Sequence, residues 1–456
     1  MLEAPEQSDS EKGDLMDDKQ LSRREFLKLA GIAGAALGVA GGLGGFVAAC
    51  GGEATTTTAG VTTSAGATET TAAGSTTSVS AAAGPVKIGM ILDYSFPLHV
   101  AWQHQMEALI PNLNEKGGLS IGGAQYQVDL RMYDGKRDSE TSRSAVQRLL
   151  SEDKVDFILG DESTDYWQPV TEGAGKVVCS VSPSPEILKA PNMWTFQAGY
   201  LNLQPAAAWG YFSEQNPNVK RIASAHPDNL MGNAEAGKVA GLAAVWGQEV
   251  AKEILYPQGT TDFSAIATAL VNTNADVFTT CAGGTVSDAQ LYKALHQAGW
   301  KGQLCAYIAW SIESAGAIVD PANFEGIISP IQATELPAGP SPVAKELIDV
   351  YTAKFGKWDY PATLHVNSWY LLKAALEKAG TLDAQKVADA IHAGLEFETA
   401  YGKAKMVPRP DLGNNLVCDA LWAITVGKVQ NGQYTVLKEM TFDEAYAYNK
   451  KVLNWA

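Results

Sequence analysis

Side chains able to hold a metal or perform catalysis are few in this 456-residue chain, and their spacing fits no common active site. The closest two of its six histidines, His99 and His104, are five residues apart and would face different sides of a helix. The chain contains no H-E-x-x-H motif and no G-x-x-x-x-G-K-[ST] motif. We therefore predict a protein that is not an enzyme and that holds no cofactor and no metal.

Polar side chains gather instead directly after short apolar segments that are typical of buried strands. Residues 86–92, 155–160 and 176–182 are such segments. In open α/β sheets, ligands bind beyond the carboxyl ends of the strands. The candidate ligand-binding residues at these ends are Tyr94, Ser95, Asp161, Ser163, Thr164, Ser182 and Ser184. As an alternative, the same hydroxyl groups could cap helices.

Strand-like and helical segments alternate through most of the chain after residue 85. The strand-like segments are 86–92, 126–134, 155–160 and 176–182, and then 221–226, 249–256, 275–281 and 303–310. Apolar residues spaced by three and four fill the intervals, which indicates helices. This alternation predicts parallel sheets connected by crossover helices. Its two runs predict an α/β protein with two doubly wound, Rossmann-like lobes.

The C-terminal third interrupts the alternation. Helical segments at 341–355, 362–379 and 383–392 precede two strands at 415–440, which are joined by an Asn-Gly turn. We predict that these elements complete both lobes, so that the chain crosses between them several times at a hinge. The predicted parts are a signal peptide at 1–49, a linker at 50–84, a first lobe at 85–200 and 330–423, and a second lobe at 201–329 and 424–456.

The first fifty residues resemble an export signal. The sequence S-R-R-E-F-L-K at residues 22–28 resembles a twin-arginine motif, and an apolar run rich in Gly and Ala follows it. The sequence V-A-A-C that ends at Cys50 resembles a bacterial lipobox, in which the cysteine carries lipid. The alternative is a signal anchor with an incidental cysteine. Residues 51–84 are nearly all Gly, Ala, Ser and Thr, a composition typical of a flexible tether.

These features predict where the protein resides. No later apolar run reaches the roughly 18 residues that a membrane-spanning helix needs, so we expect a lipid anchor on the cell membrane, with the body facing the periplasm or the cell exterior. The net charge of −16 disfavours nucleic acid as a partner. We expect a monomer.

Four further cysteines lie in apolar, strand-like segments and form no C-x-x-C motif. They are Cys179, Cys281, Cys305 and Cys418. We predict buried free thiols. If a disulfide exists, Cys281 with Cys305 is the first pair to test.

Four ordered segments carry a resemblance to a known family. They are residues 86–95 (VKIGMILDYS), residues 113–165, the sequence GTTDFS at 259–264 and the sequence YLLKAALEKAG at 370–380. In order and spacing they resemble the type I periplasmic binding proteins of the leucine/isoleucine/valine-binding class, which feed ABC importers. The resemblance implies that Ser163 and Ser184 hold a ligand carboxylate.

The loops of the predicted second lobe depart from the pattern of that family. Met231 stands where the family often has tyrosine, and Gly284-Thr285 stands where an aromatic residue is usual. No carboxylate precedes Glu313 near residues 305–311, where the family places the acid that pairs with an α-ammonium group. The second-lobe candidates are Met231, Gly284, Thr285 and Trp310. An amino acid, an aromatic or other small carboxylate, and an amide all stay open as ligands.

The sequence thus predicts an extracytoplasmic solute-binding protein of an ABC importer. It would bind a small amino-acid-like or carboxylate ligand between two lobes and deliver it to a permease. The alternatives are an exported enzyme on the same two-lobed scaffold and a ligand-sensing receptor subunit.

Overall fold

The computed structural model describes residues 83–182, 184–199, 204–280, 284–306, 310–358 and 363–453. All of them belong to one compact unit that spans Ser80–Ala456. The predicted twin-arginine signal, Cys50 with its predicted lipidation, and nearly all of the predicted tether lie outside the described residues. Within the described residues, no helix is both long enough and apolar enough to cross a membrane.

A sheet of nine strands forms the first lobe, counted over the described part of the chain. Its strands are β1 (Ala83–Leu92), β2 (Leu119–Ile121), β3 (Ala124–Asp134), β4 (Phe157–Gly160), β5 (Val178–Ser180), β6 (Thr195–Gln197), β12 (Glu396–Thr399), β13 (Gly402–Arg409) and β14 (Asn414–Trp422). Their order is β12-β13-β14-β6-β5-β4-β1-β3-β2. The strands from β3 to β14 in this order are parallel, while β2, β12 and β13 pair antiparallel with their neighbours.

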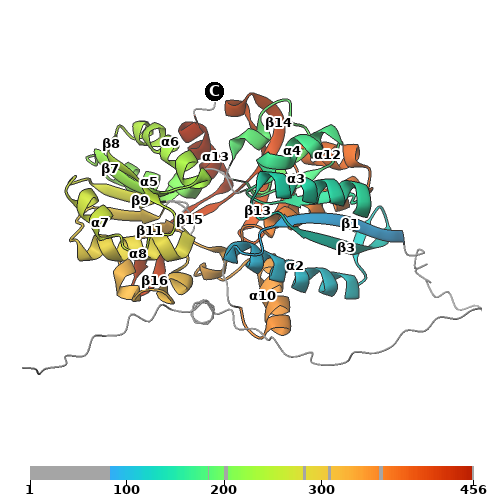
Figure 1. The fold of residues 1–456 in the computed structure, drawn as a ribbon, viewed down its shortest axis with the longest axis horizontal. Coiled ribbons are helices and arrows are strands. Elements are labelled where there is room, and N and C mark those ends of the chain that lie inside the picture. The colour runs from blue at the N-terminus through green and yellow to red at the C-terminus, as the bar shows by residue number, and fades with distance from the viewer. Residues whose placement is uncertain are drawn as a thin grey trace, which may run out of the picture. The chain divides into compact units, whose positions relative to one another are not determined.

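Helices cover both faces of this sheet because successive residues of its central strands point to opposite apolar cores. Met90 and Leu92 belong to one core, whereas Ile91 belongs to the other. The first core is covered by α2 (Pro97–Glu115), α10 (Pro342–Phe355), α11 (Asn367–Ala379) and α12 (Ala384–His392), and the second by α3 (Ser139–Arg148) and α4 (Thr164–Gly173). Figure 1 shows α2 and α3 on opposite sides of β1 and β3.

A second sheet of seven strands forms the second lobe within the same described residues. Its strands are β7 (Arg221–Asp228), β8 (Glu249–Pro257), β9 (Val277–Thr280), β10 (Gln303–Ala306), β11 (Ile328–Pro330), β15 (Ile424–Gln430) and β16 (Gln433–Met440), in the order β16-β15-β11-β10-β9-β7-β8. The strands from β8 to β11 are parallel, and β15 and β16 are antiparallel additions.

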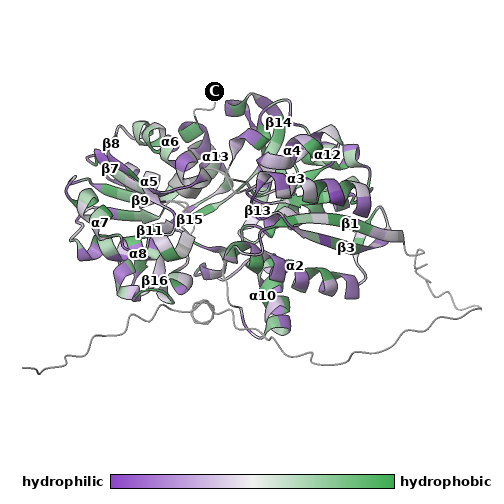
Figure 2. Cartoon of the chain, viewed as in Figure 1, coloured by the Kyte–Doolittle hydropathy of each residue, from purple (hydrophilic) through white to green (hydrophobic). Residues whose placement is uncertain are grey.

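Two further sets of helices enclose this second sheet. One apolar core lies against α5 (Gln204–Gln215), α6 (Leu230–Val245) and α13 (Phe442–Leu453), and the other against α7 (Ser264–Val271) and α8 (Gly284–Gln297). The short elements are α9 (Ile312–Gly316), the π-turn η1 (Leu149–Asp153) and the 3₁₀ turns η2 (Pro185–Leu188), η3 (Pro321–Phe324), η4 (Ala333–Glu335) and η5 (Pro410–Leu412). Figure 2 shows that helices such as α2 and α10 carry both hydrophobic and hydrophilic residues, as helices with one buried face do.

The chain passes from one sheet to the other between β6 and α5, between β11 and α10, and between β14 and β15. The last of these passages is a single residue, Ala423. The C-terminal elements therefore complete both sheets, with β14 ending in the first and β15 beginning in the second.

The predicted fold class is confirmed: the protein is α/β, with two doubly wound lobes. The predicted Asn431-Gly432 turn is also confirmed, because it joins β15 and β16 with both residues at positive φ. Several boundaries were wrong. The strand expected at 176–182 spans only Val178–Ser180, and the helix expected from residue 362 begins at Asn367.

The structure also settles the state of most of the body's cysteines. Cys179, Cys305 and Cys418 are buried free thiols, as predicted. Cys281 lies outside the described residues, but because Cys305 is free, the alternative disulfide between these two cysteines is wrong. Burial raises the pKa of each of these three thiols, so they stay protonated and pack as small apolar groups.

Candidate functional site

The candidate site lies at the carboxyl ends of β1 and β4, which are neighbours in the first sheet. The chain leaves β1 through α2 on one face and leaves β4 through α4 on the other face. In open α/β sheets, ligands bind at such a reversal, in a crevice beyond the strand ends. The loops at residues 93–96 and 161–164 border this crevice.

The loop after β1 is fixed by the Asp93 carboxylate. Asp93 Oδ1 accepts hydrogen bonds from Ser95 N–H at 2.8 Å and from Ser95 Oγ–H at 2.6 Å. The Asp93 N–H in turn donates to His99 Nδ1 at 2.9 Å. Predicted residue Tyr94 stands between these anchors with 42% of its side chain exposed, and Ser95 is exposed as well. This loop therefore presents its side chains to solvent at the edge of the crevice.

The loop after β4 is buried and closed on itself. Asp161 Oδ1 accepts hydrogen bonds from Ser163 N–H at 3.0 Å and from Ser163 Oγ–H at 2.6 Å. Thr164 Oγ1 donates to Asp161 O at 2.6 Å and lies 2.7 Å from Ser180 Oγ. Asp161 Oδ2 has no hydrogen-bond partner among the described residues, and burial raises the pKa of this carboxyl. The structure thus brings Asp161, Ser163 and Thr164 together, with both hydroxyls hydrogen-bonded inside the lobe.

Glu162, between these residues, joins two histidines that the sequence left unpaired. Its Oε2 lies 2.5 Å from His99 Nε2, and its Oε1 lies 2.9 Å from His365 Nε2. All three side chains are buried. Burial alone would raise the pKa of Glu162, but the charges and hydrogen bonds of His365 and His99 outweigh it and hold the pKa well below its usual range. Glu162 is therefore a buried, ionised carboxylate held by two imidazoles.

These three side chains also have the composition of a metal site, since their ligand atoms lie within 4.8 Å of one another. The tautomer of His99 opposes that interpretation. Its Nδ1 accepts the Asp93 N–H, so the ring proton lies on Nε2, the nitrogen that faces Glu162. A metal-bound histidine normally donates its second N–H to an acceptor, whereas here the second nitrogen faces a donor. We interpret the cluster as a buried hydrogen-bond network around an ionised carboxylate.

The predicted serines after β5 lie on the same side of the first sheet. Ser182 is buried, and its N–H donates to Gln197 Oε1 at 3.2 Å. Ser182 Oγ accepts the Ser184 N–H at 3.1 Å, and Ser184 itself is half-buried. Ser182 and Gln197 therefore link the carboxyl ends of β5 and β6, as Thr164 and Ser180 link those of β4 and β5.

The predicted residues of the second lobe lie at the carboxyl ends of β7, β9 and β10. Met231 is in the first turn of α6, and Gly284 and Thr285 begin α8. Trp310 is only 3% exposed, and its ring packs edge-on against Phe324 with 4.6 Å between ring centroids. The indole of Trp310 therefore contributes to the apolar core of the second lobe.

Sequence reasoning missed the cluster of Glu162, His99 and His365 and also Arg137. Glu162 and His365 are 203 residues apart, so no local pattern connects them. Arg137, in contrast, follows directly after β3, and the rule applied to the ends of the other strands would have found it. Its guanidinium carbon lies 4.5 Å from the centre of the Phe96 ring at the mouth of the crevice.

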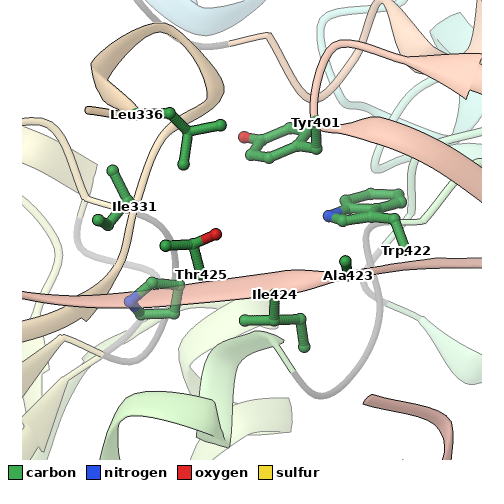
Figure 3. A pocket seen from close by; sticks show the side chains of 8 residues that line it. Ile331, Leu336, Tyr401, Trp422, Ala423, Ile424 and Thr425 are labelled. Atoms are coloured by element: carbon green, nitrogen blue, oxygen red, sulfur yellow. The ribbon is translucent and has the colours of Figure 1, made fainter. Parts of the chain in front are cut away.

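A small pocket lies where the chain passes between the lobes (Figure 3). Its lining is mostly apolar and consists of Pro330, Ile331, Leu336, Tyr401, Trp422, Ala423, Ile424 and Thr425. Tyr401 stacks on Trp422 at 5.1 Å, and its hydroxyl donates to Gln332 Oε1 at 2.7 Å. The pocket thus belongs to the passages between the lobes rather than to the polar strand ends.

One segment has the spacing of a hydrolase nucleophile, namely Gly118-Leu119-Ser120-Ile121-Gly122. In hydrolases that serine occupies a sharp turn between a strand and a helix. Ser120 instead lies exposed on β2, in an antiparallel hairpin with β3 at the edge of the sheet. This segment therefore lacks the geometry of a nucleophile.

Comparison with known sequences gives a family match over most of the body. The model of a family described as periplasmic binding protein matches residues 85–419. The chain is also similar to the leucine-, isoleucine-, valine-, threonine- and alanine-binding protein of Pseudomonas aeruginosa. The two are 27% identical over 315 residues, which cover 67% of this chain and 80% of that protein.

Comparison with solved structures gives the same fold. The leucine-binding protein LivK of Thermotoga maritima has a TM-score of 0.62 at 22% identity, over 79% of this chain and 99% of that one. A solute-binding protein of an ABC transporter from Rhodopseudomonas palustris BisB5, solved with 3,4-dihydroxybenzoic acid, has a TM-score of 0.62 at 16% identity, over 79% and 98% of the two chains. At these identities the likeness establishes the fold alone.

Proposed function

Because the chain belongs to the periplasmic binding protein family, we propose that it is the solute-binding protein of an ABC importer. It would bind a small ligand between its two lobes and deliver it to a permease. The observation that carries this proposal is the reversal of the chain at the carboxyl ends of β1 and β4, where residues 161–164 form a buried polar loop. Hydrogen bonds within the lobe fix the positions of Ser163 and Thr164 in this loop.

The proposed ligand contacts divide between the lobes. In the first lobe they come from the exposed loop of Tyr94 and Ser95 and from the backbone and small side chains of the loops after β4 and β5. In the second lobe they come from the loops that begin α6 and α8 and from the segment that follows β10. The proposed set is Tyr94, Ser95, Asp161, Ser163, Thr164, Ser182, Ser184, Met231, Gly284, Thr285 and Trp310.

Movement of one lobe against the other would close this site. The lobes are joined by the passages after β6, β11 and β14, and the last of them is the single residue Ala423. Short connections of this kind act as hinges, because a few backbone rotations reorient whole lobes. We propose that the two lobes are residues 85–200 with 330–423 and residues 201–329 with 424–456.

The relatives indicate two classes of ligand. The Pseudomonas aeruginosa protein binds branched-chain and small amino acids by its name, and the Rhodopseudomonas palustris protein was solved with a dihydroxybenzoic acid. Both classes are small carboxylates. We propose a small carboxylate, either amino-acid-like or aromatic, as the ligand of this chain.

The proposed location is the outer face of the cell membrane. The twin-arginine and lipobox motifs support export and lipidation at Cys50, with the tether holding the body near the bilayer. Metabolic labelling with a radioactive fatty acid tests this: the full chain should incorporate label, and the C50A variant should not. Label retained in C50A would contradict lipidation at this residue.

Binding itself is tested by the thermal stability of the purified body. A ligand that binds only the folded protein stabilises it by about 2.7 kcal/mol at one hundred times its Kd. We expect at least one of leucine, isoleucine, benzoate, 4-hydroxybenzoate, urea and short amides to raise the melting temperature. No change with any of them at millimolar concentration would contradict the proposed function.

A further inference from the structure

Arg137 lies at the carboxyl edge of the first sheet, in the turn that follows β3. The turn is rigid for local reasons. The Gly135 N–H donates to Leu92 O at 2.7 Å, and a Cβ on Gly135 would lie 2.7 Å from both Ile91 Cγ2 and Ser142 Oγ. The turn is therefore pinned to the end of β1, beside the crevice.

The backbone of this turn adopts an unfavourable conformation. Lys136 and Arg137 have φ angles of 54° and 51°, in the left-handed region that residues other than glycine seldom adopt. Two such residues in succession cost conformational energy, and strained positions of this kind gather at functional sites. The Arg137 side chain lies over Phe96, in the loop that follows β1.

The guanidinium of Arg137 contacts the Phe96 ring but has no acidic partner among the described residues. Its carbon lies 4.5 Å from the centre of the Phe96 ring, a stacked cation–π geometry. The residue is half-buried, and its charge acts on His99 and Tyr166. Among the described residues, its side chain makes no hydrogen bond and no ion pair. Its planar set of N–H donors is therefore free on the side away from Phe96.

Three acids near these strand ends interact with neighbouring groups of the first lobe. Asp93 accepts from Ser95, Asp161 accepts from Ser163, and Glu162 is held by His99 and His365. Negative charge on these carboxylates would repel an anionic ligand, and the Arg137 guanidinium over Phe96 is a cation at this edge that opposes the repulsion. A stacked guanidinium presents parallel donors that match the two oxygens of a carboxylate.

We propose that Arg137 binds the carboxylate of the ligand and thereby restricts the protein to carboxylate-bearing solutes. This inference rests on the proposed function and adds a specificity-determining residue to it. The exposed Tyr94 in the loop after β1 and the half-buried Tyr166 in α4 would contact the adjoining part of the ligand.

The test measures ligand affinity by calorimetry in wild type and R137Q. The probes are leucine, isoleucine, benzoate, 4-hydroxybenzoate and 3,4-dihydroxybenzoate, together with the uncharged analogues leucinamide and benzamide. We expect the wild type to bind at least one carboxylate and to bind the matching amide at least tenfold more weakly. We expect R137Q to raise the Kd of that carboxylate about ten- to hundredfold.

Two variants control the result. R148Q removes a guanidinium that also lies 4.5 Å from an aromatic ring, that of Tyr133, but that is paired with Glu152 and is mostly exposed. It should leave every Kd unchanged. R137K keeps the positive charge without the planar donors, so its Kd should fall between those of wild type and R137Q. Unchanged melting temperatures without ligand show that each variant is folded.

The outcomes separate this inference from the proposed function. Equal carboxylate affinity in wild type and folded R137Q would overturn the inference and leave the proposed function standing. Binding of benzamide or leucinamide, with no binding of any carboxylate, would do the same. If the wild type binds none of the probes, both the inference and the proposed function are contradicted.

Discussion

At the scale of single residues, the buried carboxylate of Glu162 stabilises the loop that follows β4 in the first lobe. It is buried, ionised and held by His99 and His365 at 2.5 and 2.9 Å. Removing a buried carboxylate that two imidazoles hold leaves their polar groups without partners, which typically costs about 3 kcal/mol. The amide of E162Q would also direct an N–H toward one imidazole N–H. We expect E162Q to lower the free energy of unfolding at pH 7 by about 3 kcal/mol, measured by urea denaturation.

The same carboxylate predicts the sign of a pH effect. Because its pKa is lowered on folding, its contribution is complete above the unfolded pKa and is lost as the pH falls through the folded pKa. The difference between wild type and E162Q should therefore shrink in acid. E377Q is the control, since Glu377 pairs with Lys373 at the surface, where such a pair contributes about 0.5 kcal/mol or less. Equal losses in E162Q and E377Q would contradict this account.

The buried carboxyl group of Asp288 in α8 predicts a pH dependence of stability with the opposite sign. Its side chain is buried, and its Oδ1 has no hydrogen-bond partner within the described residues. Burial raises its pKa to about 7, against a weaker lowering by the Thr280 hydroxyl. Folding therefore favours the protonated carboxyl, and the fold loses stability as the pH rises from about 4 through about 7.

The D288N variant removes this titration. We expect D288N to be more stable than wild type at pH 8, by on the order of 2–4 kcal/mol, and to differ little from it at pH 4. Melting temperatures across this range measure the effect. The control variant D349N changes an aspartate whose side chain is 61% exposed. The difference between its melting temperature and that of wild type should be the same at pH 4 and at pH 8. A constant offset between D288N and wild type at all pH values would exclude the proposed titration.

At the scale of elements, helix α6 contains two glycines, of which one has room for a Cβ atom and the other has none. A Cβ on Gly232 would lie 1.8 Å from the carbonyl oxygen of Pro227, a backbone atom that cannot turn aside. A Cβ on Gly237 would meet nothing within 4 Å. The first glycine therefore permits the close turn from β7 into α6, whereas the second is an ordinary helical position.

Substitution by alanine should separate these roles. We expect G232A to lower the free energy of unfolding by about 2 kcal/mol or more, because the turn must open. We expect G237A to raise it by about 0.5–1 kcal/mol, the usual gain of alanine over glycine in a helix. Urea denaturation of both variants gives the comparison. If G232A were as stable as G237A, the turn would not need its glycine.

The elements also show how far the sequence could predict the structure. The apolar runs that became β1, β4 and β9 are buried on both faces, so their composition alone predicted parallel strands. β6 has three residues, too few for any periodicity to show. β12 alternates between exposed and buried residues, but it is only four residues long. Short edge and return strands owe their conformation to pairing with distant partners, which a single sequence does not display.

The candidate site likewise contains features that the sequence could predict and features that it could not. The loops after β1 and β4 could be predicted because chain order places them at strand ends. The contact of Glu162 with His365 could not, since α11 reaches the first sheet only after the chain has built most of the second lobe. The positions of the serines were therefore predictable, whereas the hydrogen bonds that engage them were not.

At the scale of the whole molecule, the passages between the lobes determine what binding can do. The passage after β11 is tied to the first lobe through the Tyr401 hydroxyl and Gln332, and to the second through Glu335, which accepts from Ser311 Oγ–H at 3.1 Å. These contacts lie at the hinge rather than across the strand ends. The lobes can therefore rotate about the hinge while its local contacts persist.

Closure of the lobes follows as a testable consequence. A ligand that contacts both strand edges binds the closed state more tightly, and it shifts the population toward that state by its differential affinity. We expect saturating ligand, once one is found by thermal shift, to reduce the radius of gyration of the purified body in small-angle X-ray scattering. At the same ligand concentration, which lies below the raised Kd of R137Q, this variant should give the scattering curve of the ligand-free protein. Identical curves for free and saturated wild type would show that the protein binds its solute without closing, and the hinge would then have no part in binding.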